Sequence, residues 1–321
     1  MPGNELGRAL VIRGGALGDF LLILPVLDAL REAHPRAHLE VLAYPGIAAL
    51  ATAGGLVDAA RSIEYGPLAS FFTRDPELDP QLSEYLASFD VVISYLYDPD
   101  KIFADNLRSA GVRMLVEGPP RPAATSHAID QFAAPLGRLG IPLARRAVIL
   151  DFAPAPADAP LLAIHPGSGS PSKNWPGACW RKLAEGLLTE APAMRLAVIG
   201  GEADQGPLGA LRGLQPSSRV EFLENLSLTA LAPRLAGAEL YLGHDTGISH
   251  LAAVAGVPSL LLFGPTDPGV WAPPHENVRV LRAPDGKLED LGVATVHRAV
   301  SRMLPGSWLA SDTSGHNNDR P

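Results

Sequence analysis

The chain has 321 residues, a formal net charge of −8 and a sequence pI of about 5.6; 47% of its residues are hydrophobic and 19% are charged. This length predicts two globular domains, and the acidic balance argues against broad nucleic-acid binding and against a polybasic membrane-binding patch. A single cysteine, Cys179, excludes an internal disulfide and a cysteine-based metal site.

Short apolar runs alternate with amphipathic stretches along the first half, a pattern typical of βαβ units in a parallel sheet. The runs predict strands at Arg8–Arg13, His38–Tyr44, Arg61–Tyr65, Asp90–Tyr95 and Val112–Val116. The other stretches predict helices near Gly18–Ala33, Ile47–Ala53, Asp79–Ala87, Asp100–Ala110 and Ser126–Leu139. Residues 9–30 are apolar but carry charges and a Gly-Gly pair, so they predict neither a secretory signal nor a membrane span, and we expect a cytoplasmic protein.

A proline-rich, aperiodic segment at residues 151–160 predicts a linker, after which the alternation starts again. The second series predicts strands at Leu161–His165, Arg195–Ile199, Val220–Phe222, Glu239–Leu242 and Ser259–Phe263. Its helices are expected at Trp175–Leu188, Gln205–Leu211, Leu228–Ala236, after Gly247 and near Glu289–Met303. We therefore expect one doubly wound α/β domain over residues 1–152, a second over residues 161–305 facing it across a cleft, and a disordered polar tail over residues 306–321.

The first candidate site is a glycine-rich turn after the first strand, where Gly14, Gly15 and Gly18 surround the start of a helix that carries Asp19. An acid in the first turn stabilises the helix dipole, and at the mouth of a cleft it can also take a proton from a hydroxyl. A dinucleotide-binding turn is the alternative. The glycine spacing is not G-x-G-x-x-G, however, and Glu40 lies within the second strand rather than at its end.

Two loops in the second half predict an anion site. A Gly/Ser-rich loop follows His165 and contains Lys173, and its backbone N–H groups and movable positive charge suit a diphosphate. Further on, Asp245, Thr246 and Gly247 stand where a helix begins, and free N–H groups there favour negative charge. The alternatives are a solvated surface lysine and ordinary helix caps.

The histidines in these loops do not indicate a metal. His165 and His250 are expected to be structural hydrogen-bonding residues, and His244 and His250 lack the i, i+4 relation that places two ligands on one helix face. We therefore predict a site without a metal.

Three segments in this order resemble the signatures of glycosyltransferase family 9, the bacterial heptosyltransferase family. They are Gly-Ala-Leu-Gly-Asp within residues 13–30, His-Pro-Gly-Ser with Lys-Asn-Trp-Pro within residues 165–176, and Asp-Thr-Gly-Ile-Ser-His-Leu-Ala with Phe-Gly-Pro-Thr-Asp-Pro within residues 245–268. The resemblance implies a GT-B architecture of two Rossmann-like domains. It also implies an inverting, metal-independent transfer of a heptose from ADP-heptose, with no cofactor, onto a lipopolysaccharide-type or other glycan acceptor.

The resemblance assigns roles to single residues as well. Asp19 would be the general base, Lys173 would meet the donor diphosphate, and Asp245 would bind the donor sugar. The implied donor-binding set is Ser168, Lys173, Glu224, Asp245, Thr246, Gly247 and His250. Arg13 and Arg61 match positions where heptosyltransferases bind an acidic acceptor.

Residues 94–101 and 117–127 differ from the family's acceptor-side pattern, and the first half has no dense basic patch. Two alternatives stay open: an NAD(P)-dependent oxidoreductase, and a non-catalytic nucleotide-sugar-binding member of the same fold. We expect no nucleic-acid partner, and at most a peripheral contact with the inner face of the inner membrane.

Overall fold

A computed structural model describes residues 6–304 and Trp308, so nearly all of the tail predicted at residues 306–321 lies outside the described residues. Two parallel sheets organise the chain, in the strand orders β3-β2-β1-β4-β5 and β11-β10-β9-β6-β7-β8. The first sheet contains β1 (Arg8–Ile12), β2 (His38–Ala43), β3 (Ala59–Ser62), β4 (Val91–Ser94) and β5 (Leu115–Glu117). The second contains β6 (Leu161–His165), β7 (Arg195–Gly200), β8 (Val220–Glu224), β9 (Leu240–His244), β10 (Ser259–Phe263) and β11 (Val278–Arg282).

Both strand orders are doubly wound, as predicted from the alternation of apolar and amphipathic stretches. The order reverses between β1 and β4 in the first sheet and between β6 and β9 in the second. At such a switch point the loops at the carboxyl ends of two neighbouring strands diverge and leave a crevice, which is where ligands bind in open α/β sheets.

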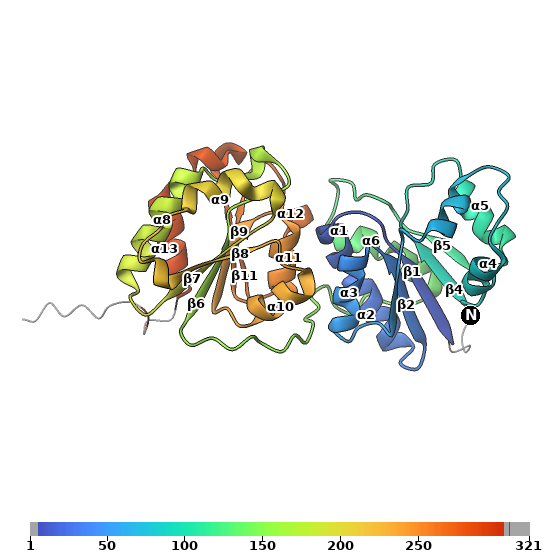
Figure 1. Cartoon of the computed structure of the whole chain (residues 1–321). Helices are drawn as coiled ribbons and strands as arrows, with labels where there is room; N and C mark the ends of the chain where they lie inside the picture. Colours follow the sequence, from blue (N-terminus) through green and yellow to red (C-terminus); the bar gives the residue numbers. More distant parts are fainter. Residues whose placement is uncertain (1–5, 305–307, 309–321) are drawn as a thin grey trace, which may run out of the picture.

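Helices cover both faces of each sheet (Figure 1). On the facing sides lie α1 (Leu17–Leu21), α2 (Leu24–Ala33), α3 (Pro45–Ala53) and α6 (Ala128–Phe132) of the first unit, and α10 (Leu228–Ala236), α11 (Gly247–Val254) and α12 (Pro268–Trp271) of the second. On the far sides lie α4 (Pro80–Ala87), α5 (Ile102–Ser109), α8 (Gly177–Glu190), α9 (Gln205–Leu211) and α13 (Val293–Ser301). The chain also forms α7 (Ala134–Leu139).

One apolar cluster spans the two units, and each unit has a further cluster of its own. A single cluster of buried side chains includes Val11 of β1, Leu50 of α3, Leu235 of α10 and Leu251 of α11. Helix α1 packs against α11, and α3 packs against α10. Residues 151–160, predicted as a linker, contain neither helix nor strand, although the exact domain boundaries stay a prediction.

Prolines divide two helices that we had predicted as continuous. The predicted helix Gly18–Ala33 is α1 followed by α2, and Pro25 lies in the first turn of α2. The predicted helix Ser126–Leu139 is likewise α6 followed by α7, with Pro135 in the first turn of α7. Proline has no N–H to donate within a helix but fits a first turn, so it favours a new start over continuation.

The structure also differs from the prediction in a strand boundary and in two elements that the sequence did not indicate. The predicted strand Arg61–Tyr65 is β3 at Ala59–Ser62, because pairing with β2 ends at Ser62. The edge strand β11 and the short helix α12 had not been predicted. Arg279 and Arg282 interrupt the apolar residues of β11 without strict alternation, and a partly exposed strand of this kind carries a weak sequence signal.

Candidate active site

A cleft with a volume of about 320 Å³ lies between the two sheets. The first sheet contributes Ala16, Leu17 and Gly18, which follow β1. The second contributes residues from the loops after β6, β7, β8 and β9. The cleft therefore adjoins the switch points of both sheets, as the fold rule predicts.

Two glycines bring the starts of α1 and α11 together in the wall of this cleft. A Cβ atom on Gly247 would lie 2.9 Å from the backbone nitrogen of Gly18 and 2.9 Å from the Cβ atom of Leu17. A larger residue at position 247 would therefore separate the two helices. Because the first N–H groups of a helix have no intrahelical partner, this wall can offer donors to an anion.

Buried hydroxyl groups shape the start of α11. The Thr246 side chain is its N-cap and accepts a hydrogen bond from the N–H of Ser249 at 3.3 Å. The Ser249 hydroxyl donates to the carbonyl of His244 and lies 3.0 Å from the Tyr241 hydroxyl. Thr246, Gly247 and Ser168 all line the cleft, and their role in donor binding stays a prediction.

Lys173 and Asp245 form an ion pair at the same end of the second sheet. The Lys173 Nζ atom lies 2.8 Å from Asp245 Oδ2. The pair joins the loop after β6 to the loop after β9, so the structure brings together two residues predicted to meet the donor. A diphosphate that approached Lys173 would compete with Asp245 for the same ammonium group.

A series of hydrogen-bonded side chains runs from Asp204 to the N-cap of α11. Of its members, Asp204 was not predicted from the sequence. Asp204 Oδ2 lies 3.3 Å from His165 Nε2, and His165 Nδ1 lies 3.4 Å from the Thr246 hydroxyl. Burial opposes ionisation of Asp204, but hydrogen bonds from His165 and the Gly201 N–H lower its pKa below the ordinary value. Asp204 closely follows β7, so the carboxyl-end rule that found Asp245 could also have found it.

His244 fixes both ends of the loop that carries Lys173. Its Nδ1 atom lies 3.2 Å from the Gly167 carbonyl, and its Nε2 atom accepts the N–H of Trp175 at 2.8 Å. Burial lowers the pKa of His244 to about 4. The ring is therefore neutral at pH 7, with Nδ1 donating and Nε2 accepting.

This arrangement predicts a loss of stability in acid. The folded-state pKa of His244 lies below its ordinary value of 6.5, so protonation favours the unfolded chain. As the pH falls from 6.5 to 4, protonation of His244 should lower the free energy of unfolding by up to about 1.4 kcal/mol for each pH unit. Urea denaturation at pH 7 and pH 4.5 tests this: His244→Gln should be less stable at pH 7 but less sensitive to acid. An unchanged acid sensitivity in the variant would contradict the assignment.

Asp19 lies beside the cleft at the start of α1. Its Oδ2 atom accepts the Ala16 N–H at 3.2 Å, and its side chain is 32% exposed. Gly15 has φ +101°, and a Cβ atom there would lie 2.9 Å from Asp19 Oδ2. A glycine is thus required in this turn both for its backbone conformation and for space beside the carboxylate.

Arg13 does not lie where an acceptor-binding residue would be expected. Its side chain is only 3% exposed, and Nη2 lies 3.2 Å from Asp19 Oδ1. Nη1 donates to the Pro120 carbonyl at 2.9 Å, and the guanidinium lies over the ring of Phe132. Arg13 therefore orients the Asp19 carboxylate from behind instead of presenting its charge at the surface.

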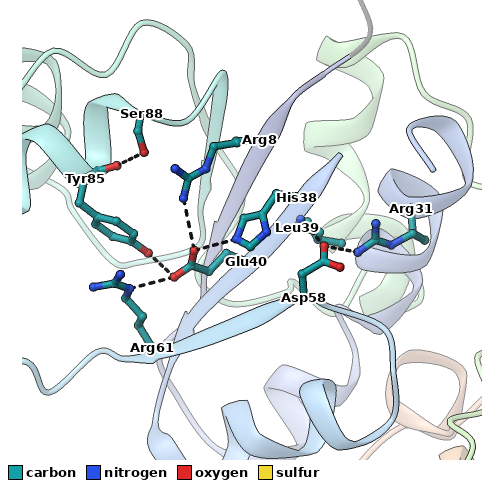
Figure 2. A network of polar contacts seen from close by, with 9 residues as sticks. All are labelled: Arg8, Arg31, His38, Leu39, Glu40, Asp58, Arg61, Tyr85 and Ser88. Atoms are coloured by element: carbon teal, nitrogen blue, oxygen red, sulfur yellow. Dashed lines mark hydrogen bonds and ion pairs between the residues drawn. The ribbon is translucent and has the colours of Figure 1, made fainter. Parts of the chain in front are cut away.

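Arg61 lies in a separate cluster around the buried carboxylate of Glu40 (Figure 2). Arg61 Nε donates to Glu40 Oε1 at 3.0 Å, and the Tyr85 hydroxyl donates to the same atom at 2.5 Å. Arg8 and His38 complete the cluster (Figure 2). Arg61 lines another cavity, of about 200 Å³, so its role in acceptor binding stays a prediction. Glu40 is fully engaged and cannot serve a nucleotide ribose, which argues against the oxidoreductase alternative.

Four of the predicted donor-binding residues, Lys173, Asp245, Glu224 and His250, are not among the residues that line the cleft. Glu224 receives two hydrogen bonds from Arg212 Nη2, at 2.7 and 2.8 Å, while its neighbour Asn225 lines the cleft. His250 is buried one turn into α11, close to Gly18. Burial lowers the pKa of His250 to about 4, so it supports this helix as a neutral ring.

Among residues 6–304 and 308, no group of three or more His, Cys, Asp or Glu side chains is arranged to hold a metal ion. None of the helices in this described part combines the length and apolar character that a membrane crossing requires.

Residues 123–298 match the model of glycosyltransferase family 9 (heptosyltransferase). Lipopolysaccharide heptosyltransferase 1 of Pseudomonas aeruginosa is 41% identical over 119 residues, which are 37% of this chain and 33% of the relative. The enzyme of the same name from Escherichia coli K12 is 36% identical over 131 residues, 41% of this chain and 40% of the relative. The matched segments thus span only about a third to two fifths of these curated relatives.

Solved structures are similar over almost the whole chain. A family 9 glycosyltransferase from Veillonella parvula superimposes with a TM-score of 0.78 at 18% identity, covering 94% of this chain and 98% of that one. The E. coli heptosyltransferase WaaC with ADP superimposes with a TM-score of 0.70 at 23% identity, covering 92% and 100%. These similarities confirm the predicted fold of two facing Rossmann-like domains.

Proposed function

Because the chain belongs to glycosyltransferase family 9, the heptosyltransferase family, we propose that it transfers a heptose from ADP-heptose onto a hydroxyl of a lipopolysaccharide-type or other glycan acceptor. The observation that carries this proposal is the cleft itself. Thr246 and Gly247 at the start of α11, where free N–H groups suit an anion, line it, and the Asp19 carboxylate of α1 stands at its edge. The names of the curated relatives and of the ADP-bound neighbour support the donor.

In this proposal the donor diphosphate lies against the first N–H groups of α11. Thr246 and Gly247 stand at that helix start, and Lys173 supplies a positive charge from the adjoining loop. These donors stabilise the negative charge that develops on the departing ADP without a metal ion. The apolar part of the cleft, which includes Ile199, Leu223 and Leu231, takes the nucleoside.

Asp19 is the proposed general base. The acceptor oxygen forms a bond to the anomeric carbon of the heptose while the bond from that carbon to the phosphate oxygen breaks. The hydroxyl proton passes to the Asp19 carboxylate, and the bonding electrons leave with ADP. Because base and leaving group lie on opposite domains, attack comes from the face opposite ADP, and the configuration inverts.

The proposal predicts binding of ADP and ADP-heptose without a metal ion. Either ligand should raise the melting temperature of the protein, since a ligand held by the folded state alone stabilises it by mass action. The shift should persist in EDTA, and transfer of heptose to a glycan should follow. If NAD(P) raised the melting temperature and ADP did not, the result would support the oxidoreductase alternative. Donor binding without any turnover would support the non-catalytic one.

Lys173→Met should weaken ADP binding. Loss of a charge-assisted hydrogen bond to the diphosphate costs about 1.5–3 kcal/mol, which corresponds to about a 10–100-fold higher Kd. Isothermal titration at moderate salt measures the effect. Lys182→Met, on the exposed face of α8, is the matched control and should leave the Kd unchanged. Equal affinities for both variants would remove Lys173 from the donor site.

A cytoplasmic location, a peripheral membrane contact and the lack of a nucleic-acid partner remain predictions.

A further inference from the structure

The exposed tyrosines of this chain are concentrated at one edge of the first sheet. The sequence has six tyrosines. Tyr44, Tyr65 and Tyr97 are 42, 53 and 77% exposed, and the others, Tyr85, Tyr95 and Tyr241, are half-buried or buried. All of the exposed tyrosines follow a strand of the first sheet, namely β2, β3 and β4.

These tyrosines stand at the same edge as the proposed base. Carboxyl ends of parallel strands meet at one edge of a sheet, and the loop with Asp19 follows β1 at that edge. The order β3-β2-β1-β4 places Tyr44 and Tyr65 on one side of the Asp19 loop and Tyr97 on the other. Since neighbouring strands are about 5 Å apart, the edge from β3 to β4 spans about 15 Å, the length of a short oligosaccharide.

Side-chain packing confirms that these loops meet. A Cβ atom on Gly14 would lie 3.3 Å from Leu96 Cδ2 and 3.7 Å from Ile63 Cδ1. Leu96 precedes Tyr97, and Ile63 stands two residues before Tyr65. The loops after β3 and β4 therefore both touch the turn that leads to Asp19.

The charges along this edge do not suit a phosphorylated ligand. The segments 13–19, 44–46, 63–67, 95–101 and 118–121 contain the acids Asp19, Glu64, Asp98 and Asp100 and the bases Arg13, Lys101 and Arg121. Arg13 is buried against Asp19, and Lys101 Nζ pairs with Glu117 at 2.7 Å. Arg61, which lines a cavity together with Tyr65, pairs with Glu40. Among the described residues of this edge, exposed Arg121 is thus the one base without an ion pair, and four acids stand against it.

We propose that Tyr44, Tyr65 and Tyr97 form an acceptor-binding surface for an uncharged sugar chain. The tyrosine rings offer apolar faces on which the C–H faces of sugar rings stack, and their hydroxyls are polar handles for sugar hydroxyls. A chain held on this surface passes Asp19, which takes the proton of the attacking hydroxyl. This inference rests on the proposed function and specifies its acceptor as neutral at the contact site.

The test is saturation-transfer NMR on the ADP-saturated full-length protein. The probes are neutral di- to tetrasaccharides of hexose and heptose, and the same oligosaccharides bearing one phosphomonoester. Neutral probes should bind at least as tightly as phosphorylated ones, with a Kd that changes little between low and high NaCl. Tyr97→Ala and Tyr65→Ala should weaken binding about tenfold, whereas Tyr97→Phe and Tyr65→Phe should retain it.

Phe72→Ala is the matched control, because Phe72 is also exposed but its ring stacks on Phe103 at 4.7 Å. It should leave sugar binding unchanged. Binding confined to the phosphorylated probes, no binding of any probe, or alanine variants that bind like wild type would each overturn the inference. The Kd for ADP-heptose is measured on the same samples. If the proposed function is wrong, the wild-type protein does not bind this donor; if only the present inference is wrong, donor binding is retained.

Discussion

Asp19→Asn should lower kcat for sugar transfer by about 10²–10⁴-fold, the usual contribution of a general base. Asparagine has nearly the same shape and can still accept the Ala16 N–H, but it cannot take a proton from the acceptor. The Kd for ADP should stay unchanged, because the proposed diphosphate site lies on the other domain. Kinetics with ADP-heptose and calorimetry with ADP measure the two quantities separately.

Asp28→Asn is the control for this experiment. Asp28 lies on α2 and pairs with Arg145 Nε at 2.6 Å, outside the cleft. Its replacement should leave kcat unchanged. Full transfer activity in Asp19→Asn would remove the proposed base, and a parallel loss of ADP affinity would indicate a structural role for Asp19 instead.

Gly167→Ala should disrupt the donor half of the cleft. A Cβ atom on Gly167 would lie 1.8 Å from Asp204 Oδ1 and 2.3 Å from its Cγ atom, so the carboxylate must move. Asp204 would then lose its contacts with His165 and the Gly201 N–H. Overpacking of this kind costs about 1–3 kcal/mol of stability, and we expect a loss of ADP affinity in addition.

Gly137 of α7 provides the matched control. It lies outside the cleft, with open space where its Cβ atom would be and no left-handed backbone angle. Gly137→Ala should therefore retain the Kd for ADP and should not lower the melting temperature. If Gly167→Ala matched this control in both measurements, the contact between Gly167 and Asp204 would have no importance for the site.

Local sequence patterns predicted most of the elements and the loops of the proposed donor site. The alternation of apolar runs predicted most strands, and the polar loops after two of them contain Ser168, Lys173, Asp245 and Thr246, whose roles in donor binding stay predictions. Such loops can be located from the sequence because a residue that follows a parallel strand lies at the edge of the sheet where the strands have their carboxyl ends. The chain-long similarity to solved structures then confirmed the pairing of two domains.

Contacts between distant segments could not be predicted in the same way. Arg13 matched an acceptor-binding position, yet its guanidinium is buried against Asp19 and the ring of Phe132, which comes from α6. The closeness of Gly167 to Asp204 depends on the loops after two neighbouring strands. A single sequence shows residue types along the chain but not which loops pack together.

The acceptor side illustrates the same limit. The resemblance placed acceptor binding at Arg13 and Arg61, but one is buried and the other pairs with Glu40 in a separate cluster. Exposed tyrosines at the carboxyl edge became visible only when burial and strand order were known. Exposure of an aromatic ring is a property of the folded surface, so the sequence alone carries little signal for it.

A crystal structure of the protein soaked with ADP-heptose tests the central claim most directly. Our account predicts the diphosphate against the N–H groups of residues 246–248, with Lys173 turned from Asp245 toward a phosphate oxygen and the anomeric carbon facing Asp19. Density for the nucleotide in the groove around Gly264 and Gly286, or a diphosphate without contact to α11, would contradict it.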